Sequence, residues 1–374
     1  MRFGFLDGLR GLAAIYIVIF HAYLGLYQGM TVFSQHPELH YPFATITSWL
    51  LLPFYYGRQI VVFFFVISGF VIHYRQAKAL QDAAAVSFDI RIYFARRAWR
   101  IYPPLVFALA ITFLVDRFGM SQGFAIYTEA VLPGLIINPP HDLQTLVGNL
   151  LFLNTAYVPN FGSNGVLWSL MLEWWFYMLY PLLLWLNRRS VWQSLLVVLL
   201  LFVASLNGHW GWLILAQLVF GSLLAWWVGT LLADIMVGRI KIKLWKVSLA
   251  SLLLVPLAPT PFVTVPLPQA VQDTLWAFAF AGVIAALLAW QRRGGSLRPL
   301  ERIAFLGDMS YTLYVTHYPI IIFLAGWYVH HFDARPITTE WVFIGTTICL
   351  LVAWGAHFLV EKPFTRPRPA LTST

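Results

Sequence analysis

The sequence predicts an all-α polytopic membrane protein with about ten transmembrane helices and with both termini in the cytoplasm. The 374 residues are 60% hydrophobic and only 10% charged, whereas an ordinary soluble domain has about 25% charged residues. Apolar stretches close to the ~20 residues that cross a bilayer recur along the whole chain. The basic residues gather between these stretches, on one side of the expected membrane.

The apolar stretches follow one another with short connections, so we expect a single transmembrane domain over residues 1–374 with no separate soluble domain. The connection over 118–165 is the longest one on the far side, and we expect it to pack over the bundle only in part. The expected spans are 8–27, 59–75, 101–117, 166–187, 191–207, 211–228, 245–259, 272–290, 303–327 and 339–360.

The distribution of basic residues sets the expected orientation. If the N-terminus lies in the cytoplasm, only Arg58, Arg117 and Arg335 fall on the far side, and Arg10 lies within the first span. Such a bias follows the positive-inside rule. The net charge of +9 is therefore explained by membrane topology, and we expect no nucleic-acid partner. The one cysteine excludes an intrachain disulfide, and we expect no metal site.

The first span, "FLDGLRGLAAIYIVIFHAYLG", carries three ionisable residues, Asp7, Arg10 and His21. These residues also argue against a cleaved signal peptide. On an ideal helix Arg10 and His21 lie about 20° apart around the axis and about 16 Å apart along it, and Asp7 can pair with Arg10 one turn away. Either this stripe faces a hydrated cavity, or it is a structural ion pair with a hydrogen-bonded core histidine.

Two further motifs lie in the next two spans. Ser68 and Gly69 interrupt the bulky run "FFFVISGF", which alone indicates no more than close helix packing. In "YFARRAWRIYPP", Arg97 and Arg100 share one helix face and could clamp phosphate oxygens; the alternative is that they contact lipid headgroups. Pro103 and Pro104 permit a helix start just after them, and the expected third span begins at residue 101.

The fourth span places Ser169, Glu173 and Tyr177 on one ridge of the helix "WSLMLEWWFYMLYP". An unpaired carboxylate is costly inside a membrane, so we expect Glu173 to pair with Arg10 or with a histidine of another helix. This pair could be catalytic or only structural.

The ninth span, around "SYTLYVTHYP", places Ser310, Tyr314 and His317 on one face, while Asp308 points away from His317. Pro319 removes a backbone hydrogen bond and predicts a bend close to His317. The histidine could therefore take part in chemistry, or it could satisfy a carbonyl that the proline leaves free.

The motifs "LDGLRGLAA…FHA", "FFFVISGF", "RRAWRIYPP", "WSLMLEWWFYMLYP" and "SYTLYVTHYP" follow in this order along nearly the whole chain, which thereby resembles the integral-membrane acyltransferase 3 family. The resemblance implies a bacterial inner-membrane enzyme with acyl-CoA, typically acetyl-CoA, as donor and no permanently bound cofactor. It implies a hydroxyl of a surface polysaccharide or a lipid-linked glycan as acceptor. Some members of the family carry a C-terminal extracytoplasmic domain; we expect none here, so the membrane domain completes the transfer or hands over to polysaccharide-assembly proteins.

The resemblance also implies roles for single residues. His21, Arg10 and Glu173 are the expected catalytic residues: His21 as general base, Arg10 for developing charge and Glu173 to orient either of them. An acyl-enzyme on His21 or Ser68 is the alternative mechanism. The expected donor-binding residues are Arg97, Arg100, Ser68 and Gly69, and the expected substrate-binding residues are Ser310, Tyr311 and His317.

Two non-enzymatic functions stay open at this point. A transporter or channel could use the same intramembrane arginine, histidine and glutamate as a relay. A subunit of a lipid-bound assembly would need no CoA at all.

Overall fold

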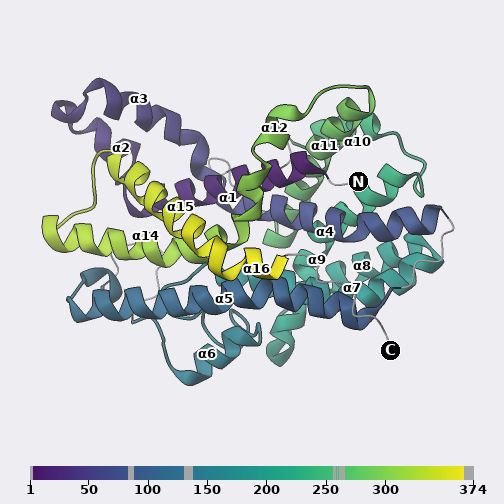
Figure 1. The fold of residues 1–374 in the computed structure, drawn as a ribbon, viewed down its shortest axis with the longest axis horizontal. Helices are drawn as coiled ribbons and strands as arrows, with labels where there is room; N and C mark the ends of the chain where they lie inside the picture. Colours follow the sequence, from purple (N-terminus) through teal and green to yellow (C-terminus); the bar gives the residue numbers. More distant parts are fainter. Residues whose placement is uncertain are drawn as a thin grey trace.

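The computed structural model describes residues 3–82, 88–129, 138–255, 258, 260 and 266–365, and the regular elements in these ranges are helices (Figure 1). In this part of the chain, eight helical segments are long and apolar enough to cross a membrane, so the protein is a polytopic membrane protein. They are α1 (Gly4–Gly25), α4 (Gly57–Gln81), α5 (Ile90–Ser121), α7 (Leu167–Arg189), Gly211–Val237 including α9 (Ile214–Val237), α11 (Gln269–Arg292), α14 (Ser310–Phe332) and Glu340–Phe364 including α15 (Glu340–Val360).

The other two expected spans are shorter apolar helices, α8 (Val191–Ser205) and α10 (Leu244–Leu254), of 15 and 11 residues. At 1.5 Å per residue these lengths fall short of the ~30 Å hydrocarbon core. The end of the expected span 245–259 lies partly outside the described residues.

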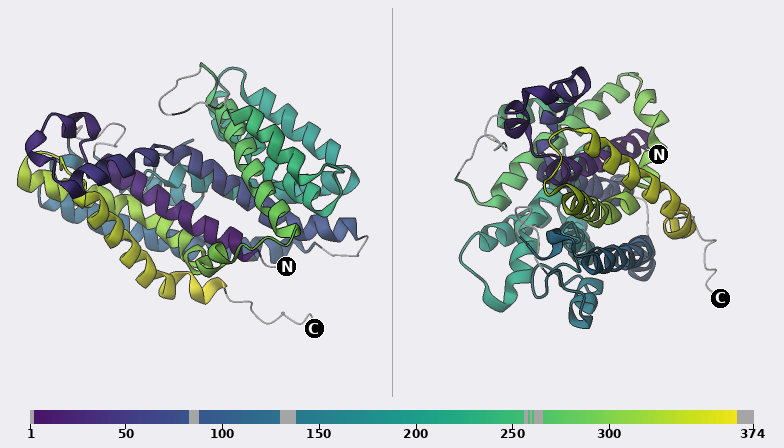
Figure 2. Two further views of the ribbon diagram at one scale, coloured as in Figure 1. Left: turned by 90° about the horizontal axis from the view of Figure 1, so that it is seen from above. Right: turned by 90° about the vertical axis from the view of Figure 1, so that its left-hand side faces the viewer.

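Shorter helical elements connect the long ones. They are α2 (Met30–Ser34), η1 (Pro37–Leu39), α3 (Pro42–Leu51), η2 (Leu52–Tyr55), η3 (Ala125–Tyr127), α6 (Leu143–Leu150), η4 (Gly211–Leu213), α12 (Arg298–Arg302), α13 (Ala304–Asp308) and α16 (Lys362–Thr365). The start of α1, the end of α4 and the start of α5 lie at one end of the molecule, called the N-terminal end below, and α2 and α3 lie toward the opposite end (Figures 1 and 2).

Glycines allow α4 and α9 to cross in close contact. A Cβ atom on Gly69 would lie 2.2 Å from the Trp226 carbonyl oxygen, and one on Gly229 would lie 2.0 Å from the Val66 carbonyl oxygen. Neither backbone atom can yield, so the two helices pack at this distance only with glycine at both positions.

The expected span 303–327 is wrong at its start, because α14 begins at Ser310. The preceding residues form α12 and α13, which pack against the glycine side of α1. A Cβ on Gly8 would lie 2.1 Å from the Leu300 carbonyl oxygen, and one on Gly307 would lie 2.2 Å from the Asp7 carbonyl oxygen. This close backbone contact accompanies a break in the helix that hydropathy alone does not reveal.

The expected start of the third span at residue 101 is also wrong, because α5 begins at Ile90 and runs through both Pro103 and Pro104. The Asp89 side chain caps the helix by accepting hydrogen bonds from the backbone amides of Arg91 and Ile92 at 2.8 and 2.9 Å. The cap fixes the start about three and a half turns before the prolines. Arg97 and Arg100 therefore lie on the spanning helix itself.

Candidate active site

A cavity of about 90 Å³, called cavity A, lies among α1, α4, α5, α7 and α14. This volume holds several water molecules, since one needs about 10–15 Å³ by the same measure. Its polar lining side chains are Arg10, Ser68, Arg97, Arg100, Ser169, Glu173, Tyr177, Ser310, Tyr311 and Tyr314. Most of the site residues expected from the sequence therefore surround one space, although they come from five helices far apart in the chain.

Arg10 joins α1 to the start of α14. Its Nε donates to Ser310 Oγ at 3.0 Å, and its Nη2 donates to the Gly307 carbonyl oxygen at 2.6 Å. Asp7 Oδ1 lies 3.3 Å from Nη2, which confirms the expected pair within the first helix. These contacts hold the guanidinium at the border of cavity A with its direction fixed.

Arg97 and Arg100 lie where cavity A meets the N-terminal end of the protein. The Arg97 guanidinium lies over the rings of Tyr177 and Tyr93, with distances of 5.6 and 5.8 Å to the ring centroids. Arg100 lines cavity A and two further cavities, cavity B of about 430 Å³ and cavity C of about 390 Å³. The two arginines thus converge at a common junction, as their spacing predicts.

Glu173 lies in a chain of hydrogen bonds on the wall of cavity A. The Tyr177 hydroxyl donates to Glu173 Oε1, Ser68 Oγ lies 3.0 Å from the Tyr177 oxygen, and Trp226 Nε1 donates to Ser68 Oγ at 3.3 Å. Because the Tyr177 proton goes to the carboxylate, the Ser68 proton goes to the Tyr177 oxygen.

This chain differs from the expected pairing of Glu173 with Arg10 or with a histidine. Among the described residues, the ion pairs within 4 Å do not include Glu173. The carboxylate lines cavity A itself and accepts a hydrogen bond there from the Tyr177 hydroxyl.

His21 and His317 form a direct pair between α1 and α14. His21 Nδ1 lies 2.9 Å from His317 Nε2, and His317 Nδ1 lies 3.1 Å from the Leu313 carbonyl oxygen. A carbonyl only accepts, so the hydrogen-bond network assigns the proton of neutral His317 to Nδ1. His317 Nε2 then accepts from His21 Nδ1–H, and His21 Nε2 keeps its lone pair. His317 is fully buried, whereas His21 is partly exposed.

The histidine pair adjoins cavity A without lining it. Within the described part of the chain, the lining of cavity A does not include His21, His317 or Gly69. Tyr314 lines the cavity, its ring lies 5.9 Å from the His317 ring, and its hydroxyl lies 2.6 Å from Ser169 Oγ. Tyr314 is therefore the wall that the cavity and the histidine pair share.

The loop before α7 packs against the same part of α14. Pro319 has no N–H to donate to the Val315 carbonyl oxygen, and Asn164 Nδ2 donates to that oxygen at 2.9 Å. The carbonyl that the proline frees is therefore satisfied by Asn164. Next to it, a Cβ on Gly165 would lie 3.2 Å from the Tyr318 ring, which contacts His21 with 4.8 Å between ring centroids.

Sequence reasoning missed Trp226, Asn164 and Tyr318. Trp226 and Asn164 lie on segments with no recognisable motif, and only the missing donor at Pro319 signals that a partner is needed. No group of three or more His, Cys, Asp or Glu side chains that could hold a metal ion is found in the described ranges.

Comparison with protein families identifies the family of this chain. Residues 3–358 match the acyltransferase domain of the acyltransferase 3 family, a range that includes every motif of cavity A and the histidine pair. Comparisons with curated proteins and with solved structures give no match. Since the matched range covers nearly the whole chain, the protein belongs to the acyltransferase 3 family and is a membrane acyltransferase.

Proposed function

We propose that the protein transfers an acyl group, typically acetyl, from cytoplasmic acyl-CoA to a hydroxyl of a cell-surface polysaccharide or a lipid-linked glycan. The observation that carries this proposal is cavity A, which joins two arginines at the N-terminal end to Arg10 and Glu173 deeper in the bundle. Guanidinium pairs suit phosphates, and the family supplies the acyl-transfer chemistry.

In this proposal the N-terminal end faces the cytoplasm and both termini lie there. The basic residues support this orientation by the positive-inside rule. The membrane is the bacterial inner membrane, where cytoplasmic acyl-CoA and outward-facing glycans lie on opposite sides of the protein. Polysaccharide-assembly proteins are the macromolecular partners that fit this location.

The donor phosphates lie at Arg97 and Arg100, and the pantetheine arm extends along the wall that contains Ser68. Gly69 supports this wall indirectly by letting α4 approach α9. Ser310 is held by Arg10, so Ser310 and the adjacent Tyr311 lie on the donor side of the site, and His317 serves the acceptor side through His21. The protein holds no permanent cofactor, and acyl-CoA is a substrate.

His21 Nε2 is the atom proposed to take the proton from the acceptor hydroxyl. The hydroxyl oxygen then bonds to the thioester carbonyl carbon, the carbon–sulfur bond breaks, and the proton passes to the leaving thiolate of CoA. Arg10 compensates negative charge on the donor side. Since Tyr314 is the wall between cavity A and the histidines, its side chain has to move before the thioester reaches His21.

The function is tested with purified protein in sealed vesicles and acetyl-CoA labelled in the acetyl group. We expect the label to appear on an added glycan acceptor, or as released acetate when no acceptor is present. Unchanged acetyl-CoA accumulating inside the vesicles would instead identify a transporter. Absence of both CoA binding and label transfer would contradict the proposal and favour an assembly subunit.

A further inference from the structure

Cavities B and C both reach Arg100 from the N-terminal end, but their charges differ. Cavity B is lined by three cations, Arg10, Arg75 and Arg100, and by three anions, Asp7, Asp308 and Glu361. The charged lining of cavity C is cationic, with Arg75, Arg96, Arg97 and Arg100, except for the one carboxylate of Asp89. An anionic ligand with several phosphate charges is therefore favoured in cavity C and not in cavity B.

The acidic groups of cavity B are also engaged with the protein. Asp7 pairs with Arg10 at 3.3 Å. Glu361 accepts from the backbone amide and the hydroxyl of Thr312 at 3.2 and 2.6 Å, close to the start of α14. These hydrogen bonds and this ion pair hold the two carboxylates in the lining. Their negative charge therefore continues to offset the arginines of cavity B.

Cavity C has a wall of three aromatic rings. The centroids of Phe88 and Tyr93 lie 5.2 Å apart, those of Tyr93 and Tyr180 lie 5.6 Å apart, and those of Phe88 and Tyr180 lie 6.1 Å apart. Arg97 lies over the Tyr93 ring at 5.8 Å. Aromatic rings beside guanidinium groups suit a planar base that carries phosphates, because the base stacks and the phosphates accept hydrogen bonds.

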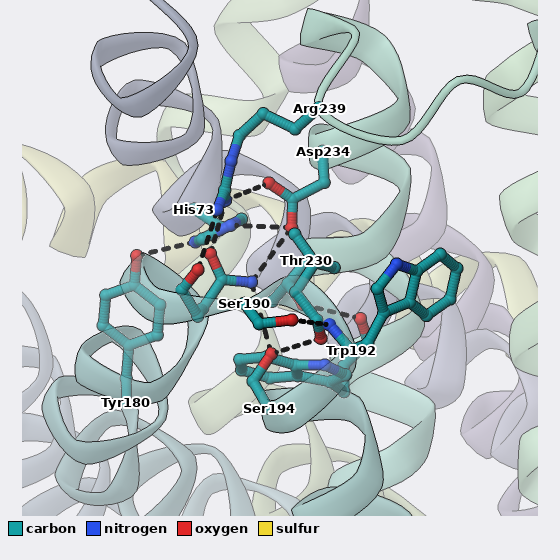
Figure 3. A network of polar contacts seen from close by, with 11 residues as sticks. His73, Tyr180, Ser190, Trp192, Ser194, Thr230, Asp234 and Arg239 are labelled. Atoms are coloured by element: carbon teal, nitrogen blue, oxygen red, sulfur yellow. Dashed lines mark hydrogen bonds and ion pairs between the residues drawn. The ribbon is translucent and has the colours of Figure 1, made fainter. Parts of the chain in front are cut away.

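A buried polar network links Tyr180 of this wall to α4 and α9 (Figure 3). His73 Nδ1 lies 3.0 Å from the Tyr180 hydroxyl, and His73 Nε2 lies 3.2 Å from Asp234 Oδ2. Arg239 donates to Asp234 Oδ1 at 2.6 Å and to Asn187 Oδ1 at 2.5 Å. His73 and Asp234 have no exposed surface, so their contacts with Tyr180 and Arg239 join α4, α7 and α9 behind the aromatic wall.

We propose that the nucleotide end of acyl-CoA enters through cavity C, with its base against Phe88 and Tyr93, which pack on the buried ring of Tyr180, and its phosphates at the arginines, while cavity B takes no nucleotide. His73 and Asp234 are positioning residues that hold Tyr180 in the wall. This inference rests on the proposed function. It adds that the donor enters through cavity C, that its base stacks on the aromatic wall, and that His73 and Asp234 hold this wall in place.

The test compares acetyl-CoA with acetyl-pantetheine, a donor that lacks the nucleotide. In Phe88→Leu we expect the KM for acetyl-CoA to rise about tenfold, the size of one lost stacking contact, with no change in kcat or in the KM for acetyl-pantetheine. Phe88→Trp should restore the low KM. Tyr74→Leu, which changes an aromatic residue that lines cavity B, is the matched control and should leave both KM values unchanged.

The positioning role is tested with Tyr180→Phe, which removes only the hydroxyl bonded to His73. We expect the KM for acetyl-CoA to rise about threefold with no change for acetyl-pantetheine, since one hydrogen bond to the wall is lost. A general structural defect would change both donors equally.

Two outcomes separate this inference from the proposed function. No transfer from either donor by the wild-type protein would contradict the proposed function. Transfer from both donors, with Phe88→Leu at the wild-type KM or with Tyr74→Leu raising it, would contradict only the inference about cavity C.

Discussion

His21 Nδ1 lies 2.9 Å from His317 Nε2, and this contact joins α1 to α14 through two residues that lie 296 positions apart in the sequence. Because His317 Nδ1 faces the Leu313 carbonyl oxygen, the pair has one consistent arrangement of protons when both rings are neutral. That arrangement leaves the lone pair of His21 on Nε2, the atom a general base needs. His317 is thus the residue that sets the tautomer of His21.

Replacement of His317 tests this role. In His317→Ala the His21 ring loses its acceptor, and we expect kcat to fall about 100-fold, within the range of general-base contributions, with the KM for acetyl-CoA unchanged. His317→Gln retains an acceptor oxygen and should recover part of the loss. Steady-state kinetics with both variants measure the effect. An equal loss in kcat for the two variants would contradict a tautomer-setting role.

Tyr177→Phe is expected to lower stability through Glu173. The variant removes the hydroxyl that donates to Glu173 and leaves a carboxylate inside the bundle without that donor. The expected loss is about 1–3 kcal/mol of unfolding free energy, measured by denaturant unfolding in detergent. Tyr157→Phe is the control, because the Tyr157 hydroxyl donates at the exposed surface. Equal unfolding free energies for the wild type and Tyr177→Phe would show that the hydrogen bond to Glu173 does not stabilise the protein.

Gly69→Ala is expected to destabilise the contact between α4 and α9. The new Cβ would lie 2.2 Å from the Trp226 carbonyl oxygen, and forcing the helices apart costs about 1–3 kcal/mol. Gly355→Ala provides the control, because a Cβ there has no neighbouring atom within 4 Å. Thermal unfolding should show a lower midpoint for the first variant only. Unchanged midpoints in both would contradict the close packing.

Asn164 and Pro319 are expected to be coupled. Asn164→Ala leaves the buried Val315 carbonyl oxygen without its donor, at a cost of about 1–3 kcal/mol. Pro319→Ala restores a backbone N–H to the same oxygen, so the double variant should be more stable than Asn164→Ala alone. A double-mutant cycle of unfolding free energies measures this coupling. Strictly additive effects would show that Asn164 does not replace the missing backbone donor.

Local periodicity predicts the parts of the site that lie on one helix. The stripe of Arg10 and His21, the ridge of Glu173 and Tyr177, and the common face of Arg97 and Arg100 all follow from 3.6 residues per turn. The partners across helices do not follow from it: Glu173 is not paired with Arg10 or with a histidine among the described residues, and Arg10 bonds Ser310 and the Gly307 carbonyl oxygen instead.

The boundaries that failed have local physical causes. Proline is common at the first position of a helix, but the Asp89 side chain caps α5 before Ile90, well before Pro103 and Pro104. The helix break before Ser310 lies where Gly307 contacts the backbone of α1. This contact is between segments far apart in the sequence, so local sequence patterns do not reveal it. The eight long helices were recognisable from composition, whereas the short lengths of α8 and α10 were not.

The central claim is that His21 takes the proton of the acceptor hydroxyl, and His21→Ala tests it most directly. The measurement is transfer of labelled acetyl from acetyl-CoA to a glycan, with CoA binding measured on the same preparation and His331→Ala, an exposed histidine, as the matched control. We predict that His21→Ala binds CoA as the wild type does and loses transfer by at least about 100-fold, while His331→Ala keeps it. Transfer at the wild-type rate in His21→Ala would contradict the account.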